Sequence, residues 1–334
     1  MLDKLQLKFP FHLNFHPDLF PRCDQAGHTH SRHASYSWFS DLRSTGLPVT
    51  FYFRNRWTGD HKIEIHEVWH RSAQEILDIC QQVIIEDPMP LPVMRLDLAA
   101  DVPGLTVAWF RGHMVAKHKR RNTYYLKQNP PSLVEGSESL PSFRLETSCF
   151  GRSNRYVVYD KLQELEAQAR AGRLSEANAK LLGWYKATGQ PYTRVERQCQ
   201  SRVPKELKTL DALFANASTF DPFSALELLP GAPSLPDLEN YSPSNLLQGL
   251  GVYFGIQKFG IQEFRAMLNK RGGHANEILQ RFGAFIPGDP AGFQIPDLRQ
   301  LYQSSLRLGP GPATDAIPLG LSNWMCPAVT APVQ

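Results

Sequence analysis

The feature that most constrains the fold of this chain is a series of short segments in which apolar and polar residues alternate. A period of two is typical of β-strands, because successive side chains of a strand point to opposite faces of the sheet. Residues that favour turns separate many of these segments. The segments lie at residues 5–11, 49–57, 61–69, 94–102, 122–128, 143–151, 155–163 and 192–200.

Two other segments have the composition and spacing of helices. Residues 71–86 repeat apolar side chains at offsets that place them on one helical face, and residues 162–187 are rich in helix-forming residues, with Gly172 as a break. Thr58, Gly59 and Asp60 form a credible hairpin turn between two of the predicted strands. We therefore expect an α+β fold, a mostly antiparallel sheet with packed helices, followed by a small helical domain.

Composition along the chain indicates where domains begin and end. The 334 residues suffice for one large or two ordinary domains. We predict a first domain at residues 1–216, a linker rich in Pro and Ser at 217–245, and a small helical domain at 246–286. Residues 287–334 are rich in Pro and Gly and are predicted to form a flexible tail.

The cysteines and the apolar runs bear on the protein's location. The five cysteines are scattered, and no pair has the spacing of a zinc finger or of a Cys-x-x-Cys motif, which suits a reducing cytoplasm. The first residues lack the continuous apolar core of a signal peptide. No run approaches the ~18 apolar residues that a membrane span requires. We expect a cytoplasmic protein without a membrane partner.

Three of the predicted strands each carry a pair of polar or reactive side chains on one face. Carboxylates can bind Mg²⁺ or Mn²⁺, cationic side chains can hold phosphate, and a tyrosine can attack phosphorus. Any one such pair is more often a solvated strand face, so the expectation depends on the three strands lying side by side in the sheet. The pairs are Arg95 with Asp97, Tyr159 with Lys161, and Arg194 with Glu196.

The formal net charge is only +4, but the cations are unevenly distributed. Residues 102–134 contain no Asp or Glu. The same stretch includes Tyr124 and Tyr125, which could stack on bases while the cations contact phosphates. The alternative is a solvated basic hairpin, and the absence of acids favours DNA contact. The cations are Arg111, Lys117, Lys119, Arg120, Arg121 and Lys127.

Two groups of histidines are candidate metal ligands. His28, His30 and His33 lie far from the tyrosine in sequence, and a polar loop explains them better than a zinc site. His66 follows Glu64 by two residues on one predicted strand face, so either side chain could border a metal.

Beyond these patterns, the chain resembles the gene II replication endonucleases of filamentous phages and, more distantly, the tyrosine-dependent initiators of rolling-circle plasmids. The resemblance covers residues 1–216 in order and approximate spacing, and the segment GLGVYFGIQKFGIQEFRAML resembles the family's C-terminal domain more weakly. Its motifs are MLDKLQLKFPF, MRLDLAADV, RSNRYVVYDKLQE and YTRVERQCQSR, each short and individually common.

The resemblance implies an enzyme that nicks one strand of origin DNA and holds the 5′ end covalently. It makes Tyr159 the nucleophile, Asp97 and Glu196 ligands of Mg²⁺ or Mn²⁺, and Lys161 a contact to the phosphate or leaving group. Its implied partners are double- and single-stranded origin DNA and the host helicase and polymerase of a bacterial cytoplasm. The residues expected to contact DNA are Arg95, Lys117, Lys119, Arg120, Arg121 and Arg194.

Three alternatives remain open at this point. Plasmid-type initiators carry their tyrosine before a Gly-Ser-Arg turn, where this chain has Cys149 and Phe150, and Tyr156 is a rival to Tyr159. A DNA-binding regulator that has lost nicking would keep the same scaffold. A metal-dependent nuclease that activates water would not need Tyr159.

Overall fold

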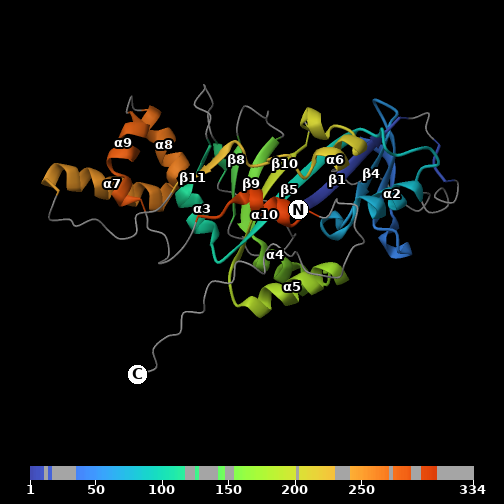
Figure 1. The fold of residues 1–334 in the computed structure, drawn as a ribbon, viewed down its shortest axis with the longest axis horizontal. Helices are drawn as coiled ribbons and strands as arrows, with labels where there is room; N and C mark the ends of the chain where they lie inside the picture. Colours follow the sequence, from blue (N-terminus) through green and yellow to red (C-terminus); the bar gives the residue numbers. More distant parts are fainter. Residues whose placement is uncertain are drawn as a thin grey trace. The chain divides into compact units, whose positions relative to one another are not determined.

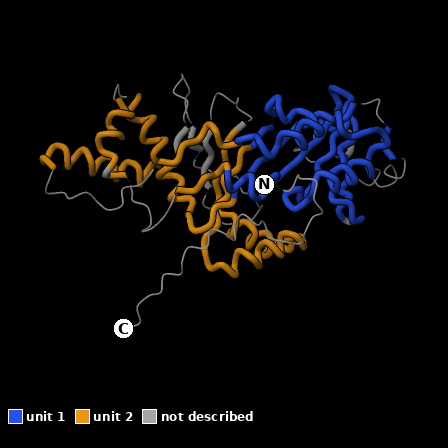
Figure 2. The backbone as a smooth tube through the Cα atoms, viewed as in Figure 1, with its two compact units in different colours: residues 1–100, 198–221, 300–334 blue, residues 101–197, 222–299 orange. Residues whose placement is uncertain are grey.

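The computed structural model describes most of the chain, and its compact parts form two units. Unit 1 comprises residues 1–100, 198–221 and 300–334, and unit 2 comprises residues 101–197 and 222–299 (Figure 2). The residues described within them are 1–10, 14–16, 35–116, 125–127, 142–146, 154–200, 203–229, 241–270, 274–286 and 295–306.

Unit 1 is built on antiparallel strands in the order β2-β3-β4-β1-β5, of which Figure 1 labels β1, β4 and β5. The register pairs Leu5 of β1 with Ile65 of β4 on one side and with Leu96 of β5 on the other. Residues 101–103 at the end of β5 belong to unit 2. The strands are β1 (Leu2–Phe9), β2 (Tyr36–Asp41), β3 (Val49–Asn55), β4 (His61–Ile65) and β5 (Val93–Pro103).

Alternation along these strands separates a core from a polar face. The side chains on one face of the sheet are apolar and almost fully buried, whereas the residues between them are polar. The alternating pattern stabilises unit 1 mainly by burying the apolar side chains of this face. The core side chains include Leu5, Leu7, Val49, Phe51, Ile63, Ile65, Leu96 and Leu98.

Helix α2 (Ala73–Gln81) follows the β3–β4 hairpin, as its apolar spacing predicts. Ser72 and Glu75 form a capping box, in which Glu75 N donates to Ser72 Oγ at 3.2 Å and Ser72 N donates to Glu75 Oε2 at 2.7 Å. Other short helices among the described residues of unit 1 are η3 (Leu42–Thr45), η4 (Val68–His70), η6 (Lys205–Leu207) and α6 (Leu210–Asn216).

Part of the predicted tail is ordered. Helix α10 (Leu298–Ser304) lies within residues 287–334, and its Tyr302 is fully buried. The Tyr302 hydroxyl donates to Ala217 O at 3.1 Å, and the Met1 nitrogen donates to Ser305 Oγ at 2.7 Å. The prediction of a flexible tail is wrong for these residues, because apolar side chains at 298, 301 and 302 bury one helical face.

Unit 2 contains the second group of strands, in the order β10-β9-β8-β7. Strands β7 and β8, and β8 and β9, pair antiparallel, with Ser142 opposite Tyr159. The two predicted strand segments on either side of residue 151 are therefore antiparallel neighbours. The strands are β7 (Tyr125–Lys127), β8 (Ser142–Glu146), β9 (Asn154–Asp160) and β10 (Tyr192–Cys199). The last two residues of β10, 198–199, belong to unit 1.

Two helices connect β9 to β10, as their composition predicts. Helix α4 (Lys161–Arg170) and helix α5 (Glu176–Thr188) flank Gly172, whose φ of 65° lies in the left-handed region that favours glycine. Asp160 caps α4 by accepting a hydrogen bond from Gln163 N at 2.9 Å.

Residues 102–134, the acid-free stretch, and the predicted linker at 217–245 both contain helices or strands that the sequence pattern does not predict. Residues 107–113 form helix α3 (Val107–His113), which leads into β6 (Met114–Ala116). Strand β11 (Leu226–Leu228) pairs antiparallel with β6, and Phe223 and Leu226 are buried. The start of the predicted linker, residues 217–229, is therefore packed.

The helical module predicted near residues 246–286 is present within unit 2 and consists of α7 (Pro243–Phe259), α8 (Ile261–Lys270), α9 (Ala275–Arg281) and η8 (Gly283–Phe285) (Figure 1). Its core includes Val252, Ile256 and Phe282. Gly249 permits the close approach of Phe285, since a Cβ there would lie 2.3 Å from that ring.

The observed architecture confirms the α+β class with antiparallel strand pairs and helices. The domain boundaries predicted from composition do not coincide with the two compact units, because both units are assembled from separate stretches of sequence. None of the helices in the described part of the chain combines the length and apolar composition that crossing a bilayer requires.

Candidate active site

Two of the predicted site residues meet in unit 2. The Tyr159 hydroxyl on β9 donates a hydrogen bond to Glu196 Oε2 on the neighbouring strand β10 at 3.2 Å. Both residues are buried, at 4% and 3% exposure. Because a buried carboxylate with a phenol as donor can accept the phenol's proton, this pair has the geometry of a nucleophile and its base.

Lys161 lies beside this pair but not on the strand. Strand β9 ends at Asp160, and Lys161 is the first residue of α4, so the prediction that Tyr159 and Lys161 share a strand face is corrected. The helix cap at Asp160 ends the strand. The Lys161 ammonium still lies 5.9 Å from the centre of the Tyr159 ring, and it donates to Glu164 Oε2 at 2.5 Å.

Tyr156, the rival tyrosine, is separated from this pair by its position on β9. It lies three positions before Tyr159, so the two side chains lie on opposite faces of a regular strand. Its hydroxyl donates to Pro222 O at 2.8 Å, and the residue is fully buried. This contact gives the Tyr156 hydroxyl a structural partner, whereas that of Tyr159 contacts a carboxylate.

Arg194 is not available to contact DNA in this structure. It is fully buried, and its Nε and Nη2 donate to Asp101 at 2.5 and 2.7 Å. The Tyr185 hydroxyl also donates to the Asp101 carboxylate. Burial alone would raise the pKa of Asp101, but the Arg194 guanidinium and the Tyr185 hydroxyl hold it below its usual value. The prediction of a DNA contact at Arg194 is therefore corrected, since its charge is used in the core.

Arg95 and Asp97 share a face of β5, as predicted from alternation, and they bind each other. Arg95 Nε donates to Asp97 Oδ1 and Oδ2 at 3.1 and 3.0 Å, and Nη2 donates to Oδ2 at 2.5 Å. Asp97 is 1% exposed, and burial raises its pKa despite the guanidinium. The arginine side chain keeps 23% of its surface exposed, which leaves it accessible to a phosphate.

The described residues do not by themselves form a metal centre. Among them, no group of three or more His, Cys, Asp or Glu side chains is placed to hold an ion. Asp97 belongs to unit 1 and Glu196 to unit 2, and each carboxylate already accepts hydrogen bonds from a side chain of its own unit. Binding of Mg²⁺ or Mn²⁺ stays a prediction.

A second polar cluster lies on the polar face of unit 1. Glu64 forms an ion pair with Lys4, accepts from Gln6 Nε2 at 2.8 Å, and contacts the Tyr52 hydroxyl at 3.4 Å. Burial alone would raise the pKa of Glu64, but Lys4 holds it below its usual value. His66, weighed with Glu64 as a metal neighbour, places Nε2 at 2.7 Å from Thr50 Oγ1.

Lys62 belongs to the same cluster and was missed in the sequence analysis. Its ammonium lies 3.7 Å from the centre of the Tyr52 ring, and burial lowers its pKa to about 8. The signal was present in the alternation of residues 61–65, which places Lys62 and Glu64 on one face opposite Ile63.

Several predicted DNA contacts lie outside the described residues. These are Lys117, Lys119, Arg120 and Arg121, and the histidines at 28, 30 and 33 lie outside them as well. Of the same basic stretch, Arg111 is described on α3, where its Nη2 donates to Lys258 O at 3.4 Å.

Comparison with known proteins gives a distant likeness among solved structures. No family model matches the chain, and no curated protein matches it. Among solved structures, the chain is similar to the rolling circle replication initiator protein from Geobacillus stearothermophilus, with 12% identity and a TM-score of 0.31. The match covers 65% of this chain and 77% of the other. A TM-score this low supports no argument about fold or function.

Proposed function

We propose that this protein is a rolling-circle replication initiator that nicks one strand of its origin DNA with Tyr159. The observation that carries the proposal is the hydrogen bond from the Tyr159 hydroxyl to Glu196 at 3.2 Å, with the Lys161 ammonium 5.9 Å from the tyrosine ring. The resemblance of the segments around these residues to the gene II endonucleases, in the same order along the chain, supports it independently.

The reaction transfers the scissile phosphate from the 3′ oxygen of one sugar to the oxygen of the tyrosine. The Tyr159 oxygen attacks phosphorus, the bond from phosphorus to the 3′ oxygen breaks, and the 5′ phosphate becomes linked to the tyrosine. The phenolic proton passes to Glu196, and the departing oxygen takes a proton to become a free 3′-OH, with Lys161 as the candidate donor. The phosphotyrosine keeps the bond energy, so the displaced strand can be rejoined without ATP.

The partners follow from these products. A polymerase of the host extends the 3′-OH, a helicase of the host unwinds the duplex, and the origin is bound as double- and single-stranded DNA in a bacterial cytoplasm. We propose the gene II type of initiator over the plasmid type because of the segment RSNRYVVYDKLQE. In this segment the tyrosine follows the turn at residues 151–154, whereas plasmid initiators carry their tyrosine before the turn.

The test is to map a covalent adduct. Each protein is incubated with Mg²⁺ and supercoiled DNA carrying the cognate origin, digested with protease, and the DNA-linked peptide is identified by mass. Tyr159→Phe keeps the ring and removes the reacting oxygen, so it should bind DNA and yield no adduct. Tyr156→Phe is the matched control and should still nick. An adduct on Tyr156, or robust adduct formation by Tyr159→Phe, would reject the assignment.

A second candidate is a sequence-specific DNA-binding regulator that does not nick. The burial of Tyr159 and Glu196, at 4% and 3% exposure, favours it, because a scissile phosphate has to reach the hydroxyl. A native chain that binds the origin tightly and never forms an adduct would support the regulator. Efficient nicking without an adduct would indicate water as the nucleophile and reject the tyrosine mechanism.

A further inference from the structure

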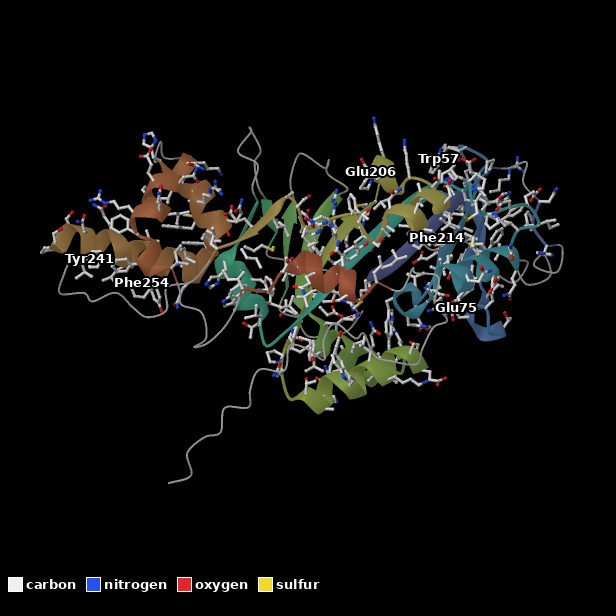
Figure 3. The ribbon with its side chains drawn as sticks, in the orientation of Figure 1. Trp57, Glu75, Glu206, Phe214, Tyr241 and Phe254 are labelled. Carbon is white, nitrogen blue, oxygen red and sulfur yellow. The ribbon has the colours of Figure 1, made fainter. Side chains whose placement is uncertain are left out.

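The β3–β4 hairpin of unit 1 ends in an exposed tryptophan. Trp57 is 75% exposed, and Figure 3 labels it in this part of unit 1. Single exposed apolar residues are common on protein surfaces, so exposure alone assigns no role. The backbone and the charges around Trp57 supply the further argument.

The tip of this hairpin is held in one conformation by Asn55. Its Oδ1 accepts from Trp57 N at 3.0 Å and from Thr58 N at 3.3 Å. Its backbone oxygen accepts from Gly59 N at 2.8 Å, and its own N donates to Asp60 O at 2.7 Å. A side chain presented on such a turn loses less conformational freedom on binding than one on a loose loop.

Arg54 at the base of the tip has a backbone conformation that non-glycine residues rarely adopt. Its φ is 47°, in the left-handed region, and its N donates to His61 Nδ1 at 3.2 Å. His61 is in turn packed against Phe53, with ring centres 4.7 Å apart. Strained positions of this kind persist where the surroundings hold them, and they concentrate at functional sites.

The charge at the tip is positive. Arg54 and Arg56 precede Trp57 on the hairpin and are exposed. Asp60 is the only acidic residue between positions 54 and 63, and Lys8 Nζ lies 2.5 Å from its Oδ2, which compensates its charge. Two exposed guanidinium groups disfavour an apolar partner and favour a polyanion whose phosphates they can contact.

We propose that Trp57, with Arg54 and Arg56 beside it, is a stacking site for an unpaired base of single-stranded DNA. The indole supplies an exposed aromatic face, and the two arginines supply the cations that follow a phosphate backbone. The inference rests on the proposed function, in which nicking and strand displacement expose single-stranded DNA. It adds a DNA contact far from Tyr159 in the sequence.

The test measures binding without cleavage. The full-length Tyr159→Phe variant serves as the background, and its affinity for a fluorescein-labelled oligodeoxythymidine and for a blunt duplex of equal length is followed by anisotropy. Adding Trp57→Ala should weaken oligodeoxythymidine binding about tenfold, the loss expected for one stacked base, and leave the duplex affinity nearly unchanged. Trp57→Phe should retain most of the affinity.

Two further variants separate stacking from charge and from general surface effects. Ile85→Ala removes another exposed apolar side chain of unit 1, at 59% exposure, and should bind like the background. Arg56→Ala should flatten the dependence of log affinity on log salt by about 0.7, the value for one phosphate contact on a single strand.

Several outcomes overturn the proposal: no binding of oligodeoxythymidine by the background protein, equal affinity of Trp57→Ala, or an equal loss on single strand and duplex. If Trp57→Ala binds DNA as the background protein does, Trp57 does not contact DNA, and a protein partner becomes the alternative. Adduct formation by the otherwise native chain is measured separately. A tenfold loss in Trp57→Ala together with no native adduct keeps the stacking site and rejects nicking, and the converse pair of results rejects only the stacking site.

Discussion

The hydroxyl of Tyr159 donates to Glu196 Oε2 at 3.2 Å between neighbouring strands of unit 2. A tyrosinate would place a second negative charge beside the Glu196 carboxylate, and the repulsion between the two charges disfavours it. The proton and the attacking oxygen are therefore expected to move in one step. In the proposed reaction the proton moves to Glu196 as the bond to phosphorus forms, which would make Glu196 a general base as well as a predicted metal ligand.

Glu196→Gln tests this role directly. The amide can still accept the hydrogen bond but cannot take the proton, so nicking should fall by about 10²–10⁴-fold while DNA binding is retained. The rate is measured as loss of supercoiled substrate in a single turnover. Glu206→Gln, on an exposed residue labelled in Figure 3, is the control and should nick at the native rate.

The same variant distinguishes the two roles of Glu196. If it acts mainly as a metal ligand, raising the Mn²⁺ concentration should recover much of the activity, because a weakened site refills by mass action. If it acts as the base, no metal concentration restores the rate. Nicking by Glu196→Gln at the native rate would remove Glu196 from both roles.

Asp97 carries the prediction of metal dependence. Excess EDTA should abolish nicking, Mg²⁺ or Mn²⁺ should restore it, and Asp97→Asn should abolish it with the metal present. Circular dichroism checks that the loss of the Arg95 ion pair has not unfolded unit 1. Asp87→Asn, on an exposed residue, is the control. Full activity in EDTA would contradict a role for a metal.

The acid-free stretch carries the prediction of nonspecific DNA contact. Replacing Lys119, Arg120 and Arg121 with Ala should weaken binding to all sequences similarly and flatten the salt dependence by about 0.9 log units for each lost duplex phosphate contact. Replacing Lys180, Lys205 and Lys208 removes the same charge elsewhere and should change the slope little. Equal slopes for the native protein and the first variant would place the stretch away from DNA.

Period-two alternation predicted most strands of this fold because burial of one sheet face imposes it on the local sequence. The same reasoning located the Tyr159 and Glu196 segments but placed Lys161 on a strand, since it ignored the cap formed by Asp160. It also assigned Arg194 to DNA. Its partner Asp101 lies 93 residues away, and no local pattern reveals such a pairing. Helix α10 was missed because Pro and Gly dominate the sequence around it.

His61 should make the stability of unit 1 depend on pH. The ring is 1% exposed and lies among aromatic side chains, with centres 5.0 Å from Phe9 and 4.7 Å from Phe53. Its Nδ1 accepts from Arg54 N, which fixes a neutral tautomer. Burial lowers the pKa of His61 to about 4, whereas the unfolded chain has a value of about 6.5.

Between those two values the unfolded chain binds a proton that the folded chain excludes, so stability is present above about pH 6.5 and is lost as the pH falls towards 4. The loss is at most about 3.5 kcal/mol, at about 1.4 kcal/mol for each pH unit of difference in pKa. His61→Phe keeps the aromatic packing and removes the titrating group, so urea midpoints measured across this range should vary less with pH than those of the native protein. Burial also lowers the pKa of His66, so a smaller slope should remain. His274→Gln, on a side chain that is 79% exposed, should leave the native slope unchanged. A native slope in His61→Phe would mean that His61 does not titrate differently in the folded and unfolded chains.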